Sequence, residues 1–257
     1  MDPPALHVDV HPGDGPPVLM VHGLMAGRAL WSANIEPLRA VATPVVIELF
    51  GHGRSPSPQD ARWYRPDAYV TQFESLRAEL GVERWLLIGQ SLGATLTLRY
   101  ALDHPNRVIG HVITNSISAL AERIGNDAEV EATAQRIEAL GRTGLAANRL
   151  NPARARRLVD SVRDSLAADQ HLLDPAAIAA AVRYTAHGSS QRTRIAENRI
   201  RTLIVAGTRE AAFVEPCRHA EATMPFVEVV RLDASHAPNA ESPALFNEAA
   251  ISFIAQL

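Results

Sequence analysis

Short apolar runs alternate along the chain with longer segments of helical period. Seven runs predict strands, at residues 6–11, 17–21, 44–49, 84–89, 108–114, 201–206 and 227–232. Most of them lack polar alternation, as expected for strands that are covered on both faces of a parallel sheet. Residues 6–11 do alternate between apolar and polar positions, which predicts an antiparallel strand at one edge.

Helical segments stand between the strands. Residues 66–80 carry apolar side chains at helical spacing, with Asp67 as a candidate N-cap and Gly81 as the stop. Residues 92–104 predict a second helix, and residues 243–257 predict an amphipathic C-terminal helix. Alternation of strands and helices with connections of this length favours a doubly wound α/β fold.

One long section interrupts the alternation. Residues 120–190 contain no convincing strand but three helical patterns, and Asp174-Pro175 forms a good N-cap and N1 pair for the last of them. We therefore expect residues 1–119 and 191–257 to form one sheet domain and residues 120–190 to form a helical cap inserted into it. The many arginines of this section are interpreted as a solvated helix face, because a chain without lysine uses arginine everywhere.

The segment GQSLG at residues 89–93 lies between a predicted buried strand and a predicted helix. A serine at such a strand-turn-helix elbow sits on a tight, strained turn, and the flanking glycines leave room for the neighbouring chain. The helix start also favours developing negative charge near the hydroxyl. Ser91 is therefore the candidate nucleophile.

A serine nucleophile needs a base. His236 follows the last predicted strand, so its loop lies at the same sheet edge as Ser91. Glu210 follows the strand before that one and is the candidate acid that orients the imidazole. Asp233 and Glu215 remain as fallback assignments for the acid.

Two backbone N–H groups are required where charge develops on the attacked carbonyl oxygen. Leu92, directly after the nucleophile, is expected to supply one, and Leu24, after the first buried strand, the other. His22 is expected to support that loop. Met25 and Trp31 are candidate walls of an apolar substrate pocket, with ordinary core packing as the alternative for Trp31.

The amino-acid composition excludes several classes of function and partner. The 257 residues carry a net charge of -3 with no long run of either sign, so neither nucleic acid nor an anionic membrane is an implied partner. The absence of lysine excludes Schiff-base catalysis, and the single Cys217 allows no internal disulfide and suggests no cysteine-based metal cluster. Residues 1–4 lack the blocks of a signal peptide, and no apolar run reaches the ~20 residues of a membrane span. We expect a cytoplasmic protein.

Taken together, the motifs resemble those of the α/β-hydrolase fold superfamily. They are His22-Gly23, GHGRS at residues 51–55, GQSLG at 89–93, GTRE at 207–210 and SHAP at 235–238. The resemblance implies an eight-stranded, mostly parallel sheet, a helical cap in the place of residues 120–190, and a Ser-acid-His mechanism without metal or organic cofactor. The chain departs from the family pattern at Glu48 and Glu210, where aspartate is common.

The expected function is hydrolysis of a small-molecule carboxylic ester or lactone through an acyl-enzyme on Ser91, with no cofactor. The serine argues against dehalogenases and epoxide hydrolases, which use an aspartate nucleophile. A carbon-carbon bond hydrolase acting on a diketone remains the enzymatic alternative. A slow-turnover ligand-sensing protein is the alternative from a different class.

Overall fold

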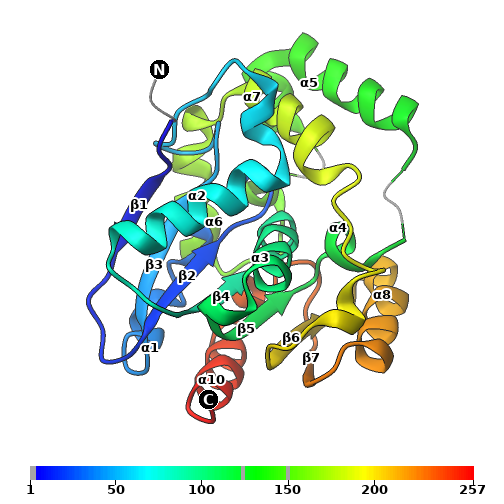
Figure 1. The fold of residues 1–257 in the computed structure, drawn as a ribbon. Coiled ribbons are helices and arrows are strands. Elements are labelled where there is room, and N and C mark those ends of the chain that lie inside the picture. The colour runs from blue at the N-terminus through cyan, green and yellow to red at the C-terminus, as the bar shows by residue number, and fades with distance from the viewer. Residues whose placement is uncertain (1–3, 123–124, 149–150) are drawn as a thin grey trace.

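A seven-stranded sheet forms the centre of the computed structural model, which describes residues 4–122, 125–148 and 151–257 (Figure 1). The strand order is β1-β3-β2-β4-β5-β6-β7, and only β1 runs antiparallel to its neighbour. The strands are β1 His7–Val10, β2 Pro17–Val21, β3 Thr43–Glu48, β4 Trp85–Gly89, β5 Val108–Thr114, β6 Thr202–Gly207 and β7 Val227–Leu232. The predicted doubly wound, mostly parallel α/β sheet is confirmed.

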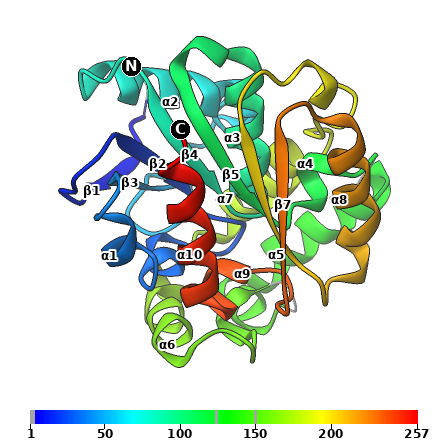
Figure 2. The same cartoon turned by 90° about the horizontal axis from the view of Figure 1, so that it is seen from below.

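Helices cover both faces of this sheet. The α-helices before and after the segment from α5 to α7 are α1 Ile35–Leu38, α2 Pro66–Glu79, α3 Leu92–Asp103, α4 Ile117–Leu120, α8 Ala211–Thr223, α9 Pro238–Glu241 and α10 Pro243–Ile254. Short 3-10 helices add η1 Arg28–Trp31, η2 Ala61–Tyr64, η3 Pro105–Arg107 and η7 Ile195–Glu197. Figure 2 shows α10 on the face opposite to α2 and α3.

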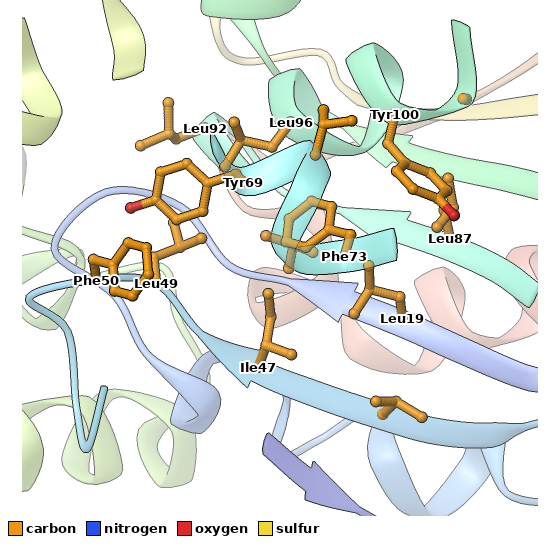
Figure 3. Packing of buried hydrophobic residues seen from close by; sticks show 14 of the residues in the cluster. Leu19, Ile47, Leu49, Phe50, Tyr69, Phe73, Leu87, Leu92, Leu96 and Tyr100 are labelled. Carbon is orange, nitrogen blue, oxygen red and sulfur yellow. The ribbon is translucent and has the colours of Figure 1, made fainter. Parts of the chain in front are cut away.

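Successive side chains along the strands point alternately to the two faces of the sheet. Leu19, Ile47 and Leu87 point toward α2 and α3, where they meet Phe73 and Tyr100 in the cluster of Figure 3. Their neighbours along the strands pack on the other face, against α10. Both faces of the central strands are thus apolar, which is why these strands appeared in the sequence as continuous apolar runs.

The eight strands implied by the family resemblance are not all present, because the sheet has seven within the described residues. Seven apolar runs were identified in the sequence, and each forms one of these strands. The other long apolar patterns of the described chain recur at helical spacing and form helices, so none of them supplies an eighth strand.

The predicted helix boundaries hold with one correction. The helix α2 ends just before Gly81, as expected, but Asp67 is not its N-cap. Pro66 occupies the first helical position, where its missing N–H costs nothing, so the N-cap is Arg65 and Asp67 falls in the first turn. At α7, Asp174 does cap the helix, since its side chain accepts the Ala177 N–H.

The described regular elements that lie within residues 120–190 are all helices, joined by turns. They are α5 Asp127–Ala147, η4 Pro152–Arg154, α6 Asp160–Ala168, η5 Asp169–Leu172, α7 Pro175–Ala180 and the π-helix η6 Ala181–Ala186. In Figure 1, α5 and α7 lie together beyond the sheet, and the two helices share many contacts. Residues 1–3, 123–124 and 149–150 lie outside the described chain, so the predictions that include them are tested only in part.

Candidate active site

Ser91 sits at the turn between β4 and α3, directly before the first helical residue. Its backbone has φ 51° and ψ -116°, a strained conformation for a residue with a side chain. At Gly89 and Gly93, on either side of Ser91, the surrounding atoms leave no space for a side chain. A Cβ at Gly93 would stand 2.0 Å from the Val21 carbonyl oxygen, and one at Gly89 would stand 2.5 Å from Ala94 Cα. The GQSLG segment therefore forms the expected elbow for steric reasons.

Three predicted side chains converge at this elbow. Ser91 Oγ lies 2.9 Å from His236 Nε2, and His236 Nδ1 lies 2.8 Å from Glu210 Oε1. With Nδ1–H donated to the carboxylate, Nε2 is left to accept the serine proton. The three residues come from the loops after β4, β7 and β6, which end at one edge of the parallel sheet.

Glu210 is held by more than His236. The Asn115 side chain donates to Glu210 Oε2 at 2.8 Å and to the Ser235 carbonyl oxygen at 3.1 Å. Its own Oδ1 accepts the Gly207 N–H at 2.7 Å, so one amide joins the acid loop to the histidine loop. Burial alone would raise the pKa of the Glu210 carboxyl, but hydrogen bonds from His236 and Asn115 and the positive charge of His236 outweigh it and hold that pKa below its ordinary value.

The two fallback acids lie elsewhere. Asp233 forms an exposed ion pair with Arg209, at 2.5 Å between Oδ1 and Nε. Glu215 forms an ion pair with Arg192, at 2.7 Å between Oε1 and an Arg192 NH group. Of the three candidate carboxylates, the structure brings only Glu210 to His236.

The backbone N–H groups of Leu24 and Leu92 are both unengaged by any hydrogen bond among the described residues. The next N–H along the first loop is not available, because Met25 donates it to His52 Nε2 at 3.0 Å. Met25 has a positive φ of 58°, which marks the sharp turn of this loop. Leu24 and Leu92 therefore retain free donors on the two chain segments that approach Ser91.

Two buried histidines fix that loop. The His22 ring accepts the Leu49 N–H through Nε2 at 3.0 Å, and its Nδ1 lies 2.7 Å from the Gly23 carbonyl oxygen. The ring centroids of His22 and His52 lie 5.0 Å apart. Burial lowers the pKa of His22 to about 4, and burial together with the charge of His22 lowers the pKa of His52 to about 3. Both rings are neutral at pH 7, as acceptors must be, and His22 has the supporting role that was expected.

The two candidate pocket walls differ. Met25 is buried against residues of α5 and α7, including Ile137 and Ile178, so it faces the helical segment. Trp31 is fully buried on the opposite face of the sheet, with its ring 6.5 Å from that of Phe246. The prediction of Trp31 as a pocket wall is wrong, because η1 turns this side chain toward α10.

Asn115, Ser116 and His52 were not identified from the sequence as residues of the site. Asn115 and Ser116 directly follow β5, the position after a strand that singled out the other candidates, and Ser116 Oγ donates to the Ser91 carbonyl oxygen at 2.7 Å. His52 was noted only as part of the GHG motif. Glu48, the first departure from the family pattern, accepts the Arg54 N–H at 2.8 Å and stabilises the same turn.

A cavity of about 440 Å³ lies between residues 118–122 and residues 186–193, and none of Ser91, Glu210 and His236 is among the residues that line it. Its lining includes Ser118, His187 and Arg192. Ser118 Oγ lies 3.2 Å from Ser116 Oγ, the hydroxyl that holds the Ser91 carbonyl. Among the described residues no cluster of three or more His, Cys, Asp or Glu side chains is arranged to hold a metal ion. None of the described helices combines the length and apolar character needed to cross a bilayer.

The family follows from a comparison with known proteins, since residues 16–159 match the model of the alpha/beta hydrolase fold. The chain belongs to this family. Its sequence is 35% identical over 121 residues to the (lyso)-N-acylphosphatidylethanolamine lipase of Homo sapiens, a match that covers 46% of this chain and 35% of the lipase. It is 33% identical over 100 residues to the 1-acylglycerol-3-phosphate O-acyltransferase ABHD5 of Rattus norvegicus, covering 38% and 28%. The chain thus matches about a third of the length of these relatives.

Solved structures of this hydrolase family resemble the chain over almost its whole length. A hydrolase from Pseudomonas aeruginosa PA01 aligns with a TM-score of 0.82 at 21% identity, covering 97% of this chain and 94% of that one. The enol-lactonase from Burkholderia xenovorans LB400 gives 0.81 at 20% identity, covering 97% and 96%. A thermophilic esterase from Thermogutta terrifontis gives 0.78 at 22% identity, covering 98% and 93%. At these identities the likeness shows the shared fold.

Proposed function

We propose that this α/β hydrolase is a serine hydrolase that cleaves a small-molecule carboxylic ester or lactone. The observation that carries the proposal is the continuous hydrogen-bonded line from Ser91 Oγ through the His236 ring to Glu210 Oε1, with steps of 2.9 Å and 2.8 Å. A serine hydroxyl beside an imidazole that a carboxylate orients is an activated nucleophile.

The reaction proceeds in two halves. Ser91 Oγ attacks the carbonyl carbon while His236 Nε2 takes its proton, and the N–H groups of Leu24 and Leu92 stabilise the oxyanion. The bond to the leaving oxygen breaks as His236 returns the proton to it. A water molecule then attacks the acyl carbon while His236 takes its proton. The bond between that carbon and Ser91 Oγ breaks, His236 returns the proton to Oγ, and the acid is released. Glu210 keeps the ring oriented and stabilises its protonated form in both halves.

The helical segment at residues 120–190 serves as the cap in this proposal. It packs over the loops that follow β2 and β3, through Met25 and through the hydrogen bond from Asp174 N–H to the Gly51 carbonyl at 3.0 Å. Two relatives of the chain are a lipase and an O-acyltransferase, and both names describe acyl chemistry, which supports an ester substrate. The predicted cytoplasmic location and the absence of a nucleic-acid partner stay predictions.

The test is the release of p-nitrophenol from short- and medium-chain p-nitrophenyl esters. We expect turnover by the wild type, its loss in Ser91→Ala by a factor on the order of 10⁴ or more, and its loss after treatment with a serine-directed phosphonate. Ser252→Ala, at an exposed serine of α10, is the matched control and is expected to keep the wild-type rate.

The other outcomes separate the alternatives. A Ser91→Ala variant with the wild-type rate would refute the mechanism. Phosphonate labelling of Ser91 without ester turnover would point to carbon-carbon bond hydrolysis or to ligand sensing. An ester product formed preferentially with an added alcohol, in place of the free acid, would identify an acyltransferase.

A further inference from the structure

A carboxylate outside the Ser91, His236 and Glu210 trio holds the loop that carries His236. Glu241, the last residue of α9, accepts the Ser235 N–H through Oε2 at 2.8 Å and the Ala237 N–H through Oε1 at 3.1 Å. Its two oxygens therefore bind the peptide groups on both sides of His236. The side chain of Glu241 is only 4% exposed, so these bonds are shielded from water.

The partner of this buried carboxylate comes from the helical segment. Arg157 lies just before α6, and its Nε stands 3.0 Å from Glu241 Oε2. Another nitrogen of the same guanidinium donates to the Asp233 carbonyl oxygen at 3.2 Å, at the start of the histidine loop. Residues 120–190 thus supply the cation in direct contact with Glu241, and Arg209, after β6, adds a second positive charge that acts on it.

Further contacts bind the same two parts of the chain. The Val159 N–H donates to the Ala240 carbonyl oxygen at 3.0 Å. Leu158 and Val162 belong to one apolar cluster with Ala237 and Ala240. The start of α6 therefore lies directly on the loop and short helix that follow His236.

Burying a carboxylate is costly unless it is paired and hydrogen-bonded, and Glu241 meets both conditions. Hydrogen bonds to a charged acceptor are also about twice as strong as neutral ones. A histidine that exchanges protons with a serine must stay within a few tenths of an ångström of its productive position. Bonds on both sides of one residue are well suited to maintain such a position.

We propose that Glu241 is a positioning residue that fixes the His236 backbone. Through its ion pair with Glu241, Arg157 makes this positioning depend on the docking of the helical segment. The inference rests on the proposed function for the reaction it serves. It assigns to residues 120–190 a part in aligning the base, in addition to covering the site.

Three variants test the proposal on ester turnover. Glu241→Gln keeps the size of the side chain but removes the charge and one of the two acceptors. Arg157→Ala removes the cation at a position that is 45% exposed, where the fold tolerates truncation. Arg163→Ala is the matched control, because Arg163 lies in the same segment but forms its ion pair with Asp160, at 2.6 Å.

We expect kcat of Glu241→Gln to fall by a factor on the order of 10 to 100, with KM within about twofold of wild type. Arg157→Ala should lose about 3-fold in kcat, the scale of a half-exposed ion pair. Arg163→Ala should match the wild type. A merely structural role would lower the melting temperature and the active fraction without this selective change in kcat per phosphonate-titrated site.

A spectroscopic readout separates this proposal from the proposed function. The proton shared by His236 and Glu210 is expected as a low-field NMR resonance, which Glu241→Gln should shift or broaden and Arg163→Ala should not. If the wild type has no ester turnover but the resonance responds in this way, the proposed function fails and the positioning of His236 by Glu241 is supported. If kcat of Glu241→Gln and Arg157→Ala stays within twofold and the resonance is unchanged, the proposal is overturned. Should Glu241→Gln not fold, Arg157→Ala decides.

Discussion

The sheet edge that carries Ser91 and the helical segment at residues 120–190 are held together by different forces. At the edge, the buried Asn115 bonds the partly buried Glu210 and the backbone at short range. In the helical segment, prominent contacts include ion pairs near solvent, such as those of Arg183 with Glu131 and Glu138. Buried networks are sensitive to single changes, whereas ion pairs near water contribute little. Chemistry and selectivity should therefore respond to different perturbations.

Acid should break the sheet edge first. The folded-state pKa values of His22 and His52 are lowered to about 4 and about 3, against 6.5 in the unfolded chain. Below pH 6.5 the unfolded state binds more protons, so stability falls as pH decreases toward the folded pKa values. The loss reaches at most about 1.4 kcal/mol per pH unit for each histidine and is smaller near pH 6.5, so the pair should cost roughly 4 kcal/mol between pH 6.5 and 4.5.

Urea unfolding followed by tryptophan fluorescence at the two pH values measures this loss. His187→Asn serves as a control from the helical segment, because His187 is only half-buried and pairs with Asp127 at 3.0 Å. The His187→Asn variant keeps His22 and His52, so it should also lose stability between the two pH values. Equal stability at pH 6.5 and 4.5 would contradict the neutral, buried state of the two rings.

A methyl group at the elbow is the next largest perturbation. The Cβ of Gly93→Ala would stand 2.0 Å from the Val21 carbonyl oxygen, a backbone atom that can move only with β2. We expect a loss of about 3 kcal/mol or more in the free energy of unfolding, as for severe overpacking, together with loss of turnover. Differential scanning calorimetry and the ester assay measure both. Wild-type stability would show that the elbow is far less tightly packed than the structure indicates.

Each of the two regions contains a buried asparagine, so the same substitution can be made in both. Asn115 joins the acid and histidine loops, whereas Asn151 donates to the Leu145 carbonyl at 2.9 Å within the helical segment. Replacing either with alanine leaves buried groups unpaired and should cost about 2 kcal/mol of stability. Only Asn115→Ala should also lower kcat, by about 10-fold, because it frees Glu210 and the His236 loop. Similar kcat losses in both variants would show that the two regions are not separable.

The sequence was informative wherever function coincided with a local pattern. Continuous apolar runs located the strands. The GQSLG segment between a strand and a helix singled out Ser91, and the position after a strand singled out Glu210 and His236. Asn115 follows the same rule and could have been found by it, since β5 ends at Thr114. The alternation of strands and helices was likewise enough to predict the doubly wound sheet.

The remaining features depend on groups that are distant in sequence. Glu241 acts on the backbone of its neighbours, but its cation, Arg157, is 84 residues away, and no local pattern links them. The orientation of Trp31 is decided by packing of η1 against α10, which composition does not reveal. His52 looked like a motif residue because its partner, the Met25 N–H, belongs to another loop.

The smallest predicted effect lies in the helical segment. Gly141 interrupts α5 with φ 54° and ψ -146°, and an added Cβ there would meet no atom within 4 Å. Gly141→Ala should therefore cost only backbone strain, about 1 kcal/mol, in contrast to the steric clash at Gly93. Faster amide exchange confined to α5, with kcat within about twofold of wild type, is the expected result by mass spectrometry and ester assay. A kcat loss above about 10-fold would mean that the shape of α5, in addition to the contact of Arg157 with Glu241, affects the position of the reacting groups.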